Sequence, residues 1–133
     1  MYEYKAVITN VVDGDTFDMD IDLGFHIHIH ERVRLLDIDT PEKFGEEKEL
    51  GLIVKQYAEN KFLGKEVVIK SEKADVEADT DSFGRWLVRV YVPEYEHYIS
   101  SIYNIIGVNK KYNTYSEDNV LKLQFYFQNI LDK

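Results

Sequence analysis

The chain has 133 residues and a mass of 15.7 kDa, enough for one domain with a buried core and too little for two. Its residues are 44% hydrophobic and 31% charged, which excludes collagen-like, low-complexity and largely disordered chains. It contains no cysteine, so disulfides and Cys-ligated zinc are excluded as well. No apolar run is long enough to span a membrane. The N-terminal segment lacks the apolar core of a signal peptide, which favours a cytoplasmic location. We therefore expect a single domain over residues 1–133 with no membrane partner.

The charge balance is acidic. Sixteen Lys and Arg residues stand against 25 Asp and Glu residues, which gives a net charge of −9. Proteins that bind nucleic acid by neutralising phosphates are usually basic, so a general polyanion binder is disfavoured. A local group of arginines or a bound cation would change this, and Ca²⁺ is the cation that carboxylates favour.

The N-terminal part of the chain predicts β-structure. Residues 4–12 resemble a strand, and a turn signal follows at 13–15. Over 16–23, hydrophobic residues alternate with aspartates, which is typical of a half-buried strand. The alternation resumes over 25–30 with histidines in place of aspartates, so the two runs predict a β-hairpin. The third strand of the sheet is expected at 32–36.

The rest of the chain predicts a mixture of helices and strands. An apolar face recurs at helical spacing over 46–63, and Gly64 follows in the position of a C-cap. The remaining predicted elements are strands at 67–71 and 86–92, a helix at 99–106 and a last helix from Ser116. Five strands with three helices, the first helix between the third and fourth strands, predict a Greek-key β-barrel with helices (α+β) of the OB-fold type.

Five polar residues lie where predicted strands end or begin. Asp15 follows a glycine turn, Asp39 heads an Asp-Thr-Pro-Glu corner, and Glu42 closes that corner. Two carboxylates at neighbouring turns could bind one Ca²⁺ together with backbone carbonyls and water. Arg34 and Arg85 precede and follow these turns, and guanidinium groups bind phosphate in a bidentate manner. Each residue alone is more often an ordinary turn or surface residue, but the five together favour a phosphate-processing site.

These residues belong to three short motifs that resemble the signatures of the staphylococcal (thermonuclease-like) nuclease family. The motifs are Asp13-Gly14-Asp15-Thr16, Arg34-x-x-x-x-Asp39-Thr40-Pro41-Glu42 and Asp81-x-Phe83-Gly84-Arg85. The resemblance covers roughly residues 5–107. It implies an OB-fold barrel with three helices and a Ca²⁺-dependent phosphodiesterase that acts on DNA or RNA and leaves 3′-phosphates.

The resemblance also implies a metal site. Asp15 and Asp39 would be Ca²⁺ ligands, and Thr40 would add its backbone carbonyl oxygen. Asp13 would lie next to these ligands without contacting the metal itself.

The resemblance assigns the reaction to other residues. Glu42 would position or deprotonate the attacking water, and Arg34 and Arg85 would bind the scissile phosphate and stabilise its transition state. Tyr112 and Tyr115 lie near the position where the family stacks the nucleoside ring, although surface or core packing explains such aromatic residues equally well. We expect the protein to be a monomer.

Two other functions remain open. OB-fold barrels are often noncatalytic modules that bind nucleic acid or protein. Such a module would be expected to lack some of the five polar residues, and all five are present here. The ladder of His26, His28 and His30 suits a Zn²⁺ site, but pairing with the aspartates of the preceding strand explains it without a metal.

Overall fold

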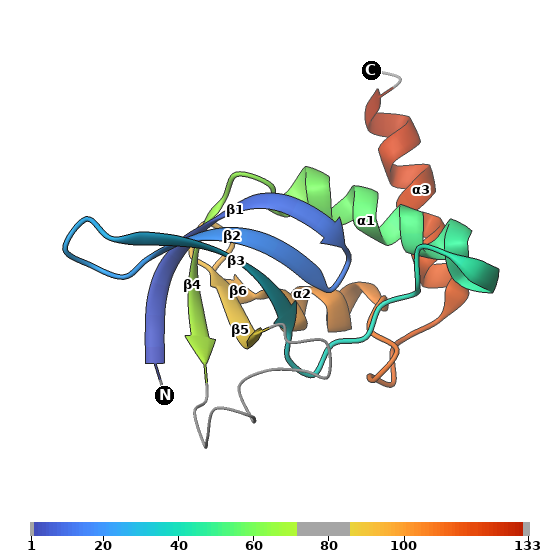
Figure 1. Ribbon diagram of the computed structural model, residues 1–133. Helices are drawn as coiled ribbons and strands as arrows, with labels where there is room; N and C mark the ends of the chain where they lie inside the picture. The colour runs from blue at the N-terminus through green and yellow to red at the C-terminus, as the bar shows by residue number, and fades with distance from the viewer. Residues whose placement is uncertain (1, 72–85, 132–133) are drawn as a thin grey trace.

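The structure, a computed structural model, describes residues 2–71 and 86–131, with side chains described up to residue 125. The described strands form one sheet in the order β3-β2-β1-β4-β5-β6, and pairing between β3 and β5 closes the first five into a barrel (Figure 1). The strands are β1 (Tyr2–Asp13), β2 (Thr16–Asp22), β3 (His28–Leu35), β4 (Glu66–Ser71), β5 (Trp86–Val92) and β6 (His97–Tyr98). The predicted five-stranded OB-type barrel is therefore confirmed.

The predicted helices are also present. The three are α1 (Lys48–Phe62), α2 (Ile99–Ile106) and α3 (Glu117–Leu131), and a short 3-10 helix that was not predicted, η1 (Gly45–Glu47), precedes α1. Helix α1 connects β3 to β4, as the sequence predicts, and the chain leaves it through Gly64 with a φ of 79°. Helices α1 and α3 lie side by side at one end of the barrel (Figure 1).

The core lies inside the barrel and under the helices. Alternate residues of β2 point inward, so Phe17 and Met19 are fully buried. The ring of Phe62, at the end of α1, lies 6.2 Å from the ring of Phe17 and 6.0 Å from that of Tyr103 in α2. These aromatic contacts fasten α1 and α2 to the same end of the barrel, which is the end where β1 and β3 finish.

The hairpin between β2 and β3 differs from the prediction. The last three residues of the run 25–30 and most of the expected third strand at 32–36 form one strand, β3, which begins at His28 and ends at Leu35. Phe25 and His26 instead form the turn, with φ values of 54° and 63°. The predicted half-buried alternation is wrong here, because the hairpin projects past the barrel and Phe25 is 96% exposed (Figure 1).

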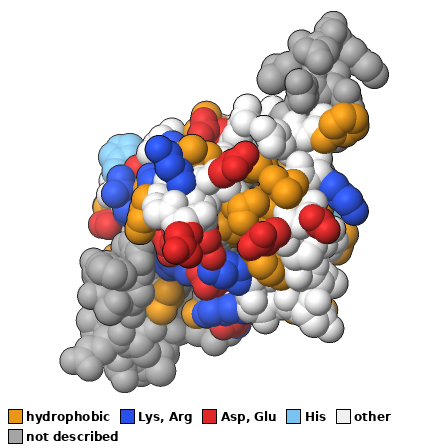
Figure 2. Space-filling model, turned by 90° about the vertical axis from the view of Figure 1, so that its right-hand side faces the viewer, with side chains coloured by type: hydrophobic (Ala, Val, Ile, Leu, Met, Phe, Trp, Pro, Cys, Tyr) orange, Lys and Arg blue, Asp and Glu red, His pale blue; other side chains and the backbone are white. Residues whose placement is uncertain are grey.

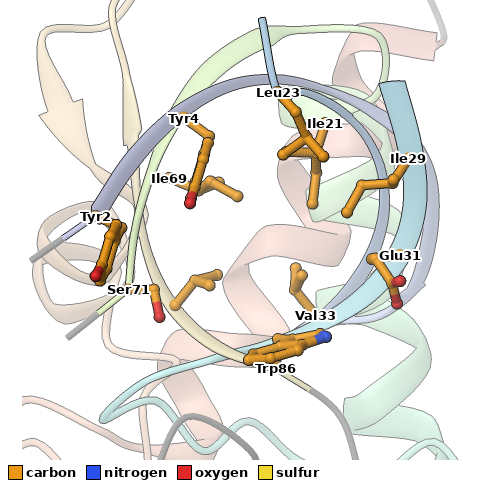
Figure 3. A pocket seen from close by; sticks show the side chains of 11 residues that line it. Tyr2, Tyr4, Ile21, Leu23, Ile29, Glu31, Val33, Ile69, Ser71 and Trp86 are labelled. Atoms are coloured by element: carbon orange, nitrogen blue, oxygen red, sulfur yellow. The ribbon is translucent and has the colours of Figure 1, made fainter. Parts of the chain in front are cut away.

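The other end of the barrel is hollow. A cavity of about 300 Å³ opens there, with a largely apolar lining from the beginnings of β1, β3 and β5 and the ends of β2 and β4 (Figure 3). The chain between Ser71 and Trp86, which both line this cavity, lies outside the described residues. No helix within the described part of the chain is long and apolar enough to cross a membrane.

Candidate metal and phosphate site

The turn between β1 and β2 places Asp15 in the protein interior, where it is only 7% exposed. Its backbone N–H donates to the Asp13 carboxylate at 3.1 Å, which fixes the turn. A Cβ atom on Gly14 would lie 2.5 Å from a methyl group of Val54 and 2.8 Å from the hydroxyl oxygen of Thr40. Glycine is required here because the turn packs directly against α1 and against the segment that carries Thr40.

Two hydrogen bonds join this turn to the segment that follows β3. The backbone N–H of Thr40 donates to Asp15 Oδ2 at 3.1 Å, and the Thr40 hydroxyl donates to the same oxygen at 3.2 Å. Asp39, the preceding residue, is half-buried. Asp15 and Asp39, 24 positions apart in the sequence, therefore come from turns that are in direct contact.

Arg34, near the end of β3, lies between the two carboxylates. Its Nη2 atom is 3.3 Å from Asp15 Oδ2 and 3.9 Å from Asp39 Oδ1, and its side chain is 17% exposed. Its Nη1 atom donates to the carbonyl oxygens of Leu35 and Ile38 at 2.9 and 2.5 Å. The guanidinium is thus held in one orientation by backbone carbonyls while it faces both acids.

The environment of Asp15 opposes its charge. Burial raises the pKa of Asp15 to about 6, and the hydrogen bond and negative charge of Asp13 act in the same direction. Arg34 and the Thr40 amide lower the pKa but do not outweigh these effects. A cation bound beside Asp15 would favour the ionised carboxylate and offset the cost of burying it.

Glu42 ends the corner and is exposed to solvent. Its backbone N–H donates to Glu47 Oε2 at 2.9 Å, and Glu47 Oε1 pairs with Lys110 Nζ at 2.8 Å. The pKa of Glu47 is lowered mainly by its hydrogen bond from Lys110. The corner that carries Glu42 is therefore attached to the connection between α2 and α3, a contact that the sequence did not predict.

The remaining predicted residues are only partly placed. Arg85 lies outside the described residues. Tyr112 is 48% exposed and Tyr115 is half-buried, and both follow the Lys110 segment whose backbone N–H donates to Asp39 O at 2.7 Å. Burial raises the pKa of Tyr115, with smaller contributions from nearby charges that include Asp39. Both tyrosines are therefore on a segment that reaches the candidate site.

Two buried side chains that sequence analysis missed hold the two turns in place. The hydroxyl of Tyr103 donates to the carbonyl oxygen of Gly14 at 2.6 Å. The side chain of Asn109 accepts a hydrogen bond from the Asp39 amide at 3.0 Å. Neither residue belongs to a recognisable motif, and both are far from the turns in sequence, so no local signal could have found them.

The donor set fits a hard cation. Asp15, Asp39 and the carbonyl oxygen of Thr40 are oxygen ligands of the kind that Ca²⁺ takes. A cation beside the buried Asp15 would also be favourable, because it would offset the free-energy cost of burying the charged carboxylate. No group of three or more His, Asp or Glu side chains that could hold a metal ion occurs among residues 2–71 and 86–131. A calcium site would therefore need the backbone carbonyl and water in addition to the two carboxylates.

The predicted histidine ladder has a different arrangement. His26 lies in the hairpin turn, while His28 and His30 are exposed residues of β3. His28 Nδ1 lies 3.1 Å from Asp20 Oδ1 on β2. Pairing between histidine and aspartate across the strands, which the sequence suggested as the alternative to a metal, is observed for this residue.

Figure 2 shows the end of the molecule where the β1–β2 turn and the segment after β3 lie. Acidic and basic side chains are interspersed there around a central group of hydrophobic ones. The described residues of this face thus form a surface of mixed charge.

Comparison with known families gives one match. The family described as staphylococcal nuclease homologue matches residues 32–124, about 70% of the chain. The match begins after the β1–β2 turn, so Asp13 and Asp15 lie outside it; the structure, however, brings Asp15 into contact with Arg34 and Thr40, which lie inside it. A search of curated proteins finds no match.

Proposed function

We propose that this chain, which belongs to the staphylococcal nuclease family, is a Ca²⁺-dependent nuclease that hydrolyses phosphodiester bonds of DNA or RNA. One observation supports this most strongly: Arg34 lies within 3.3 Å of Asp15 and 3.9 Å of Asp39, so a phosphate-binding group and two cation ligands share one site.

The proposed metal ligands are Asp15, Asp39 and the backbone carbonyl of Thr40. Asp13 lies next to Asp15 and is not itself a proposed ligand. Bound Ca²⁺ would supply Lewis-acid polarisation of a phosphate oxygen and fix the position of the phosphate. Asp13 holds the Asp15 amide, so its part is to fix the turn rather than to bind substrate.

Arg34 is proposed to bind the phosphate and to stabilise the charge that develops on its oxygens during the reaction. Its Nη1 atom is occupied by two backbone carbonyls, so its orientation is set before substrate arrives. Its Nη2 atom forms ion pairs with the two acids and would donate to a phosphate oxygen once a cation neutralises those acids.

Glu42 is proposed to orient the attacking water and to accept its proton. The water oxygen forms a bond to phosphorus, the bond from phosphorus to the 5′ oxygen breaks, and the 5′ oxygen takes up a proton, which leaves a 3′-phosphate and a 5′-hydroxyl. An exposed carboxylate at the end of the corner is accessible to solvent water, as this role requires. Arg85 is proposed as the second phosphate ligand, and Tyr112 and Tyr115 as stacking partners of a base, on the strength of the sequence motifs.

A noncatalytic binding module is the second candidate. It is favoured by the contacts of Arg34, because hydrogen bonds to two carbonyl oxygens and ion pairs with Asp15 and Asp39 would also serve a purely structural arginine. Under this alternative the chain would bind a partner without cleaving nucleic acid, and Ca²⁺ would have no effect on it.

Cleavage of single-stranded DNA, measured with Ca²⁺ and with EGTA, separates the two candidates. Asp39→Asn removes a proposed ligand, and Asp37→Asn is its matched control because Asp37 is exposed and pairs with Arg89 at 3.0 Å. We expect Ca²⁺-dependent cleavage by the wild type, a loss of about 100-fold or more in Asp39→Asn, and little change in Asp37→Asn, since supporting residues of metal sites alone account for roughly 10–100-fold. The same low activity with Ca²⁺ and with EGTA in the wild type would favour the binding module.

A further inference from the structure

Asn109 is a polar side chain deep in the fold, in the segment that follows α2, and it is only 3% exposed. Its Oδ1 atom accepts from the backbone N–H groups of Asp39 and Lys111 at 3.0 and 3.1 Å. Its Nδ2 atom donates to the carbonyl oxygen of Asp37 at 3.2 Å and to the side chain of Asn104 at 3.0 Å. A side-chain amide has two donor and two acceptor positions, so all four are used.

These bonds converge on the backbone of residues 37–39. Asn109 binds the carbonyl of Asp37 and the amide of Asp39, and the N–H of Lys110 donates to the Asp39 carbonyl at 2.7 Å. Asp37 has a φ of 62°, a left-handed conformation that is unfavourable for a residue with a side chain and needs support from its surroundings. The N–H of the next residue after Asp39, Thr40, is the group that donates to Asp15.

We propose that Asn109 is a positioning residue of the candidate site: it fixes the backbone of Asp39 and so sets how Asp39 and Thr40 face Asp15. Calcium ligands must lie within a few tenths of an ångström of their bonding distance, so a turn that is free to rotate would bind the ion weakly. This proposal rests on the proposed function for its effect on Ca²⁺ and DNA. Its structural part, the ordering of the turn, does not depend on either.

Tyr103 has the corresponding place on the other turn, where its buried hydroxyl donates to the Gly14 carbonyl. Helix α2 and the segment after it therefore hold both turns, one through Tyr103 and the other through Asn109. The relative position of the two proposed metal ligands follows from this common attachment.

A general contribution to stability is the competing explanation, and Asn119 provides the control. Its Nδ2 atom donates to the carbonyl oxygen of Thr114 at 2.9 Å, within the same connection between α2 and α3. Replacing Asn119 by alanine removes one hydrogen bond from side chain to backbone in this region, whereas replacing Asn109 removes three, together with the bond to the side chain of Asn104. Only Asn109 is bonded to Asp39.

The test compares full-length wild type, Asn109→Ala and Asn119→Ala. Amide hydrogen exchange of Thr40, measured by NMR without metal or DNA, reports whether its hydrogen bond to Asp15 is kept. Calorimetric titration with Ca²⁺ gives the affinity, and cleavage of DNA gives kcat and KM. We expect Asn109→Ala to lose about tenfold in Thr40 protection, about tenfold in Ca²⁺ affinity and a similar factor in kcat with little change in KM. Asn119→Ala should lower Tm without changing these three quantities.

Equal Thr40 protection and equal Ca²⁺ affinity in the two variants would overturn the proposal. If Asn109→Ala does not fold, Asn109→Ser, which keeps a small polar group in the buried position, is compared with Asn119→Ser by the same criteria. If the wild type itself neither binds Ca²⁺ nor cleaves DNA, the proposed function fails, and the exchange of the Thr40 amide still decides whether Asn109 orders this turn.

Discussion

Asp15 destabilises the metal-free protein at neutral pH, and Asp15→Asn should therefore make it more stable. The pKa of Asp15 is about 6 in the folded state against 3.8 for an unperturbed aspartate. At 1.36 kcal/mol for each pKa unit, the buried charge costs about 3 kcal/mol above pH 7. Asparagine has the same shape without the charge, and its oxygen can still accept from the Thr40 amide and from Arg34.

The sign of the stability change follows from the pH at which the folded and the unfolded protein each lose the Asp15 proton. Well below pH 3.8 the carboxyl is neutral in both folded and unfolded protein, so it contributes no difference. Between pH 4 and 6 the unfolded chain loses the proton first, and the free energy of unfolding of the wild type falls until the folded pKa is passed. The variant has no such fall, so its advantage should be small near pH 4 and complete above pH 7.

The attraction of Arg34 is already contained in the pKa of about 6, but the gain is still smaller than the full cost, because the amide nitrogen of asparagine cannot accept the hydrogen bond that Asp15 Oδ1 takes from the Thr16 hydroxyl at 3.3 Å. We expect about 2 kcal/mol at pH 8, or a rise of roughly 8 °C in Tm for a chain of this length. Urea unfolding in EGTA at pH 4 and pH 8 measures it. Asp18→Asn is the control with the opposite sign, because a hydrogen bond from Arg32 lowers the pKa of Asp18. An Asp15→Asn variant that is less stable at pH 8, or equally favoured at both pH values, would refute the reasoning.

Two further predictions concern activity. Arg34→Lys keeps the charge but loses the planar guanidinium group, so turnover should fall by about 10²–10³. Arg32→Lys should change turnover little, because Arg32 is an exposed partner of Asp18. Equal small losses of turnover in the two variants, with unchanged circular dichroism, would contradict the catalytic role of Arg34. With a net charge of −9, cleavage of DNA should fall less steeply with added salt than for a basic nuclease, and a steep loss from the lowest salt concentration upward would indicate a basic groove.

The fold was predictable because its information is local. The alternation of Phe17 and Met19 with aspartates identified β2, and the apolar face before Gly64 identified α1. The prediction for the hairpin tip was wrong because it needed information that is not local. Alternation over 25–30 predicts a strand, but whether that strand is half-buried depends on which other elements pack over it. Here β3 extends past the barrel, so the alternating side chains meet solvent on both faces.

The candidate site was predictable only in part. Short motifs at strand ends indicated Asp15, Arg34 and Asp39, because the ends of neighbouring strands in a small barrel lie close together. The residues that hold these turns could not be found in this way. Asn109 is 70 positions from Asp39, and nothing about an asparagine after a helix indicates which distant backbone it will bind.

The acidic character of the chain and its proposed activity can be reconciled at the site itself. Where Arg34 lies between Asp15 and Asp39, two acidic groups face one basic group, so a phosphate that approaches these three without a cation would meet repulsion. A divalent cation between Asp15 and Asp39 would remove much of that negative charge and, by the same step, release Arg34 from its acidic partners to face the phosphate. Cation binding and phosphate binding would then be coupled, since each needs the other to balance the buried charge. A basic protein surface would not be required for such a site, because the affinity would be generated within a few ångströms of the bound phosphate rather than by the field of the whole molecule.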